Sequence, residues 1–75
     1  MLASELEDIW FRTLEILKEE LSRPSFETWL KSTQLLEFDG NNIIISVPNE
    51  FAKDWLETRY YNLIKNTLQL ITKQE

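Results

Sequence analysis

The chain has 75 residues, a net charge of −5, and neither cysteine nor histidine. A domain of this length buries only about 60% of the surface that its unfolded chain exposes, so it has little core in which to build a catalytic cleft. Without histidine or cysteine, disulfides, the usual nucleophile and base pairs and nearly all zinc sites are excluded. We therefore expect a domain held together by apolar packing, with no enzymatic activity, no cofactor and no metal.

Charge and hydropathy also limit the location and the partners of the chain. Its first residues, MLASELEDIW, lack the basic and apolar regions of a signal peptide, and no apolar run approaches the roughly 18 residues of a membrane span. We expect a soluble cytoplasmic domain that binds no membrane. Its eight basic residues are scattered singly, whereas a site for a phosphate backbone would cluster them. The single glycine also excludes both common glycine-rich loops for nucleotide phosphates.

The first predicted element is an amphipathic helix over about residues 4–21, because apolar side chains recur on one stripe. The stripe consists of Leu6, Trp10, Leu14, Leu17 and Leu21, with Ile9, Thr13 and Ile16 along its edge. Ser4 is expected to cap the helix, with Glu7 as its capping-box partner. Phe11 points away from the stripe.

Acidic side chains are concentrated on this first helix. They form either a solvated face, which the helix dipole favours near the N-terminus, or a surface for a basic partner. The acidic residues are Glu5, Glu7, Asp8, Glu15, Glu19 and Glu20, against Arg12 and Lys18.

A short second helix follows in the phrase LSRPSFETWLKS. The first helix is expected to end at Ser22, and Pro24 suits the first turn of a new helix, where no backbone N–H is required. Its buried side is predicted to consist of Phe26, Trp29 and Leu30.

The next stretch, TQLLEFDGNNIIISV, changes from helical to strand periodicity. Asp39 and Gly40 give a two-residue turn signal between two apolar runs, which predicts an antiparallel hairpin. In the second strand, alternate residues are expected to face the helices. These are Ile43, Ile45 and Val47, whereas Ile44 and Ser46 lie on the opposite face.

A long helix over about residues 49–72 completes the predicted domain, with Pro48 ending the strand and Asn49 capping the helix. Phe51 lies more than about 100° from the middle of the apolar band. We expect it to be at least partly exposed beside the start of the second helix, where it either covers a neighbouring element or contacts a partner. The band comprises Ala52, Trp55, Leu56, Arg59, Tyr60, Leu63, Thr67 and Leu70, with Ile64 and Ile71 at its margin and Tyr61 and Leu68 outside it.

The order helix, helix, strand, strand, helix predicts an α+β domain with helices on one face of a small antiparallel sheet. A two-stranded sheet is a poor stopping point, so either the helices cover the hairpin or a further strand follows. We expect residues 1–75 to form a single domain, with the start of a polar tail or linker at about residues 72–75.

Two phrases, LSRPSFETWLKS and VPNEFAKDWLETRY, with IWFRTLEILKEEL before them, closely resemble the N-terminal domain of the DnaA family of bacterial chromosomal replication initiators. The resemblance extends from about Ile9 to Leu70. It implies a KH-like fold with a last strand that would follow residue 75. It also implies an interaction domain that contacts the replicative helicase, is bound by regulators of initiation and self-associates weakly. The ATPase and origin-binding modules of the family are expected elsewhere.

The resemblance also implies roles for particular residues. Phe51 matches the aromatic residue that the family uses for helicase contact, and Asn49 and Ala52 match neighbours used by regulators. A second helicase contact in the family is an acidic residue immediately before the phenylalanine of the second helix. That position is Ser25 here, so the carboxylate of Glu27 is the nearby alternative.

Thr28 and Trp29 match positions on the regulator-binding side, although Trp29 also lies on the apolar stripe. Trp10 and Leu14 match residues linked to self-association, whereas periodicity places Trp10 in the core.

Two other functions remain open. One is weak binding of single-stranded nucleic acid, which a KH-like fold suggests, although the chain lacks the GXXG loop of KH domains. The other is an adaptor unrelated to replication.

Overall fold

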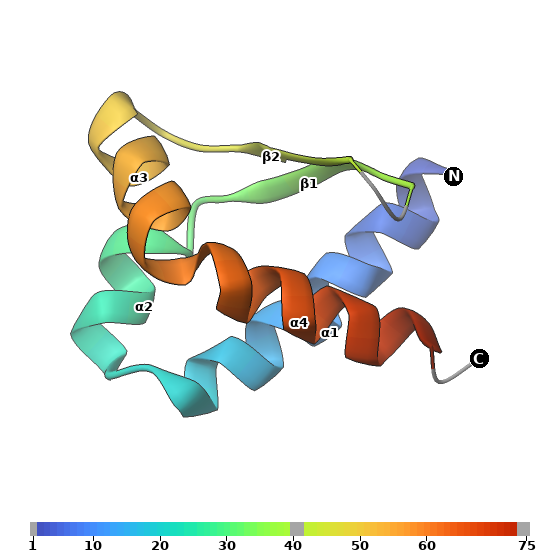
Figure 1. Cartoon of the computed structure of the whole chain (residues 1–75), viewed down its shortest axis with the longest axis horizontal. Helices are drawn as coiled ribbons and strands as arrows, with labels where there is room; N and C mark the ends of the chain where they lie inside the picture. The colour runs from blue at the N-terminus through green and yellow to red at the C-terminus, as the bar shows by residue number, and fades with distance from the viewer. Residues whose placement is uncertain (1, 40–41, 74–75) are drawn as a thin grey trace.

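The computed structural model describes residues 2–39 and 42–73. Helices α1 (Ala3–Glu20) and α2 (Arg23–Trp29) precede strands β1 (Gln34–Phe38) and β2 (Ile43–Ser46). A long helical segment follows, made of α3 (Glu50–Trp55), a π-helical turn η1 (Leu56–Tyr60) and α4 (Tyr61–Lys73). The hairpin lies over α1 and α4, while α2 and α3 close one end of the domain (Figure 1). The predicted α+β order is confirmed. Helix α4 continues through Lys73, and the rest of the expected tail, residues 74–75, lies outside the described residues.

Strands β1 and β2 form an antiparallel pair in which Phe38 lies opposite Ile43. The register shifts at Leu36, which has no partner opposite it and forms a bulge. Near the tip, the backbone N–H of Asp39 donates to the carbonyl of Asn42 at 3.2 Å. The expected turn residue Gly40 lies outside the described residues. On β2 the predicted alternation is confirmed, with Ile44 on the exposed face.

The core lies between the hairpin and the helices, and the predicted stripe of α1 faces it. Its buried apolar members are Leu6, Trp10, Leu17, Leu30, Leu35, Phe38, Leu56, Ile64 and Leu68. The indole N–H of Trp10 donates to the backbone oxygen of Thr33 at 3.2 Å and to its hydroxyl oxygen at 3.1 Å. Because a buried donor without an acceptor is costly, this pair fixes α1 against the connection from α2 to β1.

Helices α1 and α2 differ in how their N-terminal ends are capped. Helix α1 begins at Ala3, and its N-cap residue, Leu2, makes no side-chain hydrogen bond. The expected capping box of Ser4 and Glu7 is therefore wrong, because Ser4 already lies within the helix. Helix α2 is capped as predicted, since the hydroxyl of Ser22 accepts a hydrogen bond from the backbone N–H of Ser25 at 3.3 Å.

The predicted long helix over about residues 49–72 is confirmed, but at its centre the π-helical turn η1 replaces an α-helical turn. A π turn closes its hydrogen bonds over one more residue than an α turn, so it rotates the following helix by about one residue, or roughly 100°. The buried apolar residues of α4 are Ile64, Leu68 and Ile71, one position later than the predicted Leu63, Thr67 and Leu70. Thr67 is buried as well. Leu68 is fully buried, whereas Leu70 is 54% exposed.

This shift predicts that truncating Leu68 destabilises the domain strongly, whereas truncating Leu70 hardly changes its stability. Leu68→Ala should lower the free energy of unfolding by about 2 to 5 kcal/mol, because it leaves a cavity in the core. Leu70→Ala, the matched control, should change it by no more than about 0.5 kcal/mol. Urea denaturation followed by circular dichroism measures both values. An equal loss, or a larger loss for Leu70→Ala, would contradict the rotation of α4.

Candidate functional site

Phe51 lies in the first turn of α3 and is 78% exposed, the largest exposed fraction among the large apolar side chains of the described residues. The side-chain oxygen of Asn49 accepts a hydrogen bond from the backbone N–H of Ala52 at 2.8 Å and so caps the helix as predicted. This cap fixes the phase of the first turn, which buries Ala52 and turns Phe51 to solvent. The expected exposure of Phe51 is confirmed.

The position of α3 relative to α2 differs from the expectation. Figure 1 shows α3 beyond the C-terminal end of α2, far from its start. The link between the two helices is a stacked pair of indole rings, Trp29 and Trp55, whose centroids lie 5.0 Å apart at an interplanar angle of 14°. Both tryptophans are half-buried. The stack therefore joins the C-terminal ends of α2 and α3, and Phe51 lies about one helical turn before Trp55.

Arg59 extends the stacked pair, a contact that the sequence analysis missed. Its guanidinium carbon lies 4.9 Å from the centroid of Trp55, within cation–π distance. The spacing of four residues between Trp55 and Arg59 was the available signal, but the apolar band assigned Arg59 to the core and the structure exposes it. The indole N–H of Trp55 is shielded from solvent and meets no acceptor among the described residues. The ring contributes by stacking instead of hydrogen bonding.

The outer side of α2 carries the polar candidates. The hydroxyl groups of Ser22 and Ser25 lie 2.9 Å apart, so Ser25 takes part in capping α2. Glu27 is exposed and accepts a hydrogen bond from Arg23 one turn earlier at 3.2 Å. Exposed ion pairs of this kind stabilise by only about 0.2 to 1 kcal/mol, so a partner can displace Arg23 readily. Thr28 is exposed beside Glu27 in sequence.

We call Ser25, Glu27, Thr28, Asn49 and Phe51 the α2–α3 surface. The other three candidate residues do not belong to this surface. Ala52 and Trp10 are buried, and Leu14 is half-buried. For Trp10, the core position that periodicity predicted is thus the one observed.

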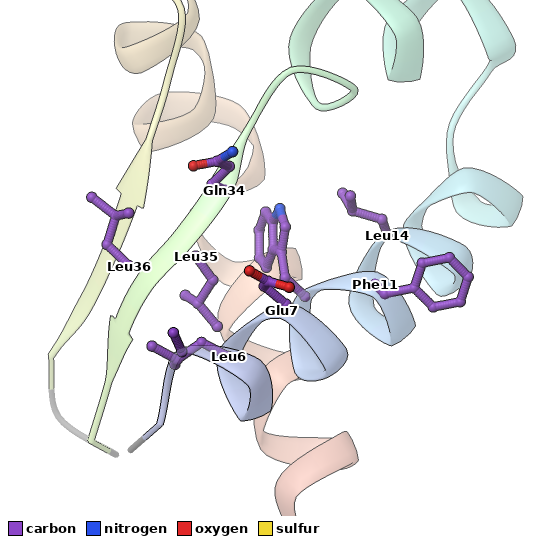
Figure 2. Close-up of a pocket in the computed structure, with 9 residues that line it drawn as sticks. Leu6, Glu7, Phe11, Leu14, Gln34, Leu35 and Leu36 are labelled. Atoms are coloured by element: carbon purple, nitrogen blue, oxygen red, sulfur yellow. The ribbon is translucent and has the colours of Figure 1, made fainter.

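A groove of about 370 Å³ between α1 and β1 was also missed by the sequence analysis (Figure 2). The sequence signal for it was Phe11, an apolar side chain that points away from the predicted stripe of the first helix. Its lining comprises Ala3, Leu6, Glu7, Trp10, Phe11, Leu14, Gln34, Leu35 and Leu36. A second groove, of about 360 Å³, lies between β2 and the long helical segment and includes Lys53 and Tyr61.

Within residues 2–39 and 42–73, the acidic side chains form no group of three or more that could hold a metal ion. In the same part of the chain, none of the helices combines the length and the apolar character that spanning a bilayer requires.

The chain matches the DnaA N-terminal domain family over residues 7–70, which is most of its length. The match includes both phrases on which the resemblance was based and every residue of the α2–α3 surface. Domains of this family are non-catalytic interaction domains that act in the initiation of DNA replication. Because the match covers most of its length, this chain is a member of the DnaA N-terminal domain family.

Proposed function

We propose that this domain recruits the replicative helicase through the α2–α3 surface. The observation that carries the proposal is the exposure of Phe51 on a well-defined helical turn. A large aromatic side chain in water contributes little to folding, whereas aromatic anchors carry much of the binding energy at protein interfaces.

The local structure prepares Phe51 for binding. Asn49 caps the first turn of α3, and the Trp29–Trp55 stack holds the helix against the end of α2. The backbone around Phe51 is thus ordered before a partner arrives, which reduces the entropy lost on association. Polar side chains from α2 and Asn49 would form the rim of such an interface.

The acidic contact is assigned to Glu27 in preference to Ser25. The hydroxyl of Ser25 is engaged with Ser22 at the start of α2, and a hydroxyl carries no charge. Glu27 presents an exposed carboxylate on the same helix. It therefore supplies the negative charge for a basic side chain of the helicase.

Regulators of initiation are proposed to bind an overlapping surface that includes Asn49, Thr28 and the backbone around Ala52. Because Ala52 is buried, its own side chain would contact a regulator only weakly. Overlap of the two surfaces around Phe51 implies that a regulator and the helicase compete for the domain.

Weak self-association through α1 is a further part of the proposal, with Leu14 and the edge of Trp10 as the contacts. Several initiator copies at an origin would then combine modest single-site affinities through effective concentration.

Single-stranded nucleic acid is the second candidate ligand, and one contact favours it. Lys65 lies 6.0 Å from the ring centroid of the exposed Tyr61, which combines an aromatic face with a cation. The net charge of −5 opposes this function.

Replacing Phe51 separates binding from folding. Phe51→Ala should weaken helicase binding by about 2 kcal/mol or more, roughly thirtyfold, and so abolish measurable binding by the isolated domain. Phe11→Ala removes an equally large exposed ring from α1 and should leave binding unchanged.

Trp55→Ala should lower the free energy of unfolding by about 3 to 5 kcal/mol, enough to unfold a small domain. Isothermal titration with the helicase and thermal melts of all three variants make the comparison. Parent-like binding by Phe51→Ala, or a melt as poor as that of Trp55→Ala, would show that Phe51 is a packing residue.

Nucleic-acid binding is expected to be negligible at physiological salt. Any residual binding should fall by several powers of ten between about 0.05 M and 0.2 M salt if it depends on many phosphate contacts. Fluorescence anisotropy with a labelled short single strand measures this. A dissociation constant of about 1 μM or less at physiological salt would instead favour the second candidate.

A further inference from the structure

Arg59 lies beside the α2–α3 surface but has no role in the function proposed above. It is exposed in the π turn η1, and its guanidinium carbon lies 4.9 Å from the ring centroid of Trp55. Trp55 in turn stacks on Trp29. Single π turns inside α-helices occur frequently at functional sites. The arginine and the two stacked rings therefore form a group to which a binding role can be assigned.

The contact with Trp55 holds the guanidinium without using its hydrogen-bonding capacity. A guanidinium over an aromatic ring contacts the ring through its flat face, whereas its five N–H donors lie in its plane and point outward. Neither of the ion pairs in the described part of the chain includes Arg59. A side chain that is already held in place loses little conformational entropy on binding, so Arg59 is prepared for an acceptor from a partner.

Arg59 is continuous with the exposed anchor Phe51. Phe51, Trp55 and Arg59 follow one another at intervals of four residues, which brings their side chains to one side of the helical segment. The backbone of Arg59 lies about 12 Å beyond that of Phe51 along the helix axis. The guanidinium turns back from there toward Trp55. A partner segment that covers Phe51 is therefore within reach of Arg59.

We propose that Arg59 is a further binding residue of this surface. It takes an aspartate or glutamate carboxylate from the same partner segment whose apolar side chain contacts Phe51, so the inference rests on the function proposed above. A guanidinium matches a carboxylate in shape and binds it through two parallel N–H bonds. Because the carboxylate of Glu27 is proposed to meet a basic side chain, the surface carries opposite charges in separate places. Such an arrangement fixes the orientation in which the partner binds.

The surrounding charges favour a single carboxylate over the phosphate backbone of a nucleic acid. The exposed charged residues of α3 are Glu50, Lys53 and Asp54, and Glu57 lies with Arg59 in η1. Arg59 is therefore not part of a basic cluster. A phosphate backbone carries a negative charge at every nucleotide and is bound by clustered basic residues, whereas one guanidinium neutralises one carboxylate. A protein partner is the occupant that these charges select.

The test is isothermal titration of the cognate helicase with the 75-residue chain and its variants. Arg59→Ala should weaken binding about tenfold, because it removes hydrogen bonds to a charged group. Arg59→Lys keeps the charge but not the two parallel N–H bonds, so it should weaken binding less. Arg59→Glu places a like charge opposite the partner's carboxylate and should weaken binding more than Arg59→Ala. The matched control Arg12→Ala removes an exposed positive charge from α1 and should leave the affinity unchanged.

Two further readouts separate binding from stacking. The melting temperatures of the three Arg59 variants should lie within about 8 °C of the parent, since an exposed cation–π contact contributes little to folding. Arg59→Ala should also reduce the loss of helicase affinity between about 0.05 M and 0.2 M salt, because one charge pair fewer is then screened. Loss of packing alone would not change this salt dependence.

The outcomes distinguish this inference from the function on which it rests. If Phe51→Ala weakens helicase binding while Arg59→Ala or Arg59→Glu binds like the parent, Arg59 is not a binding residue and the proposed function still holds. If Phe51→Ala also binds like the parent, or the parent chain does not bind the helicase, both proposals are wrong. Fluorescence anisotropy with a labelled short single strand at about 0.05 M salt covers the remaining case. If Arg59→Ala weakens only that binding, Arg59 serves nucleic acid and the inference is overturned.

Discussion

The π turn at Leu56–Tyr60 is the constraint on which the helical half of the domain depends. Before it, α3 must bury Ala52 and turn Phe51 to solvent; after it, α4 must present Ile64 and Leu68 to the core. A continuous α-helix could not do both, because these two faces differ by about one residue in phase. The π turn corrects that difference, and it also includes Arg59, which lies over Trp55.

Local patterns predicted much of this fold, and the failures share a cause. Periodicity identified the stripe of α1 and the alternation of β2, since both depend only on neighbouring residues. The exposure of Phe51 was predictable because Phe51 precedes the π turn. The burial of Leu68 was not, because packing of α4 against α1 determines where the helix changes its register. Ser4 had the residue type of a cap but lies one residue inside a helix that begins at Ala3.

The candidate site, like the fold, could be predicted from the sequence only in part. The family resemblance indicated which positions of α2 and α3 to consider, and the structure adds that Ser25 takes part in a cap while Ala52 is buried. The groove between α1 and β1 could not be predicted, because its walls lie twenty or more residues apart in sequence and Leu36 is exposed by a bulge. The start of α1 and α3 lie at opposite ends of the domain (Figure 1).

In the function proposed above, the exposed ring of Phe51, on a capped helix held by stacked tryptophans, forms the helicase contact. The most direct measurement is a nuclear magnetic resonance titration of the ¹⁵N-labelled chain with its cognate helicase. We expect the largest amide shifts at Glu27, Asn49 and Phe51, with smaller changes along α4. Largest shifts along the α1–β1 groove or on the outer face of the hairpin, with the α2–α3 surface unchanged, would contradict it.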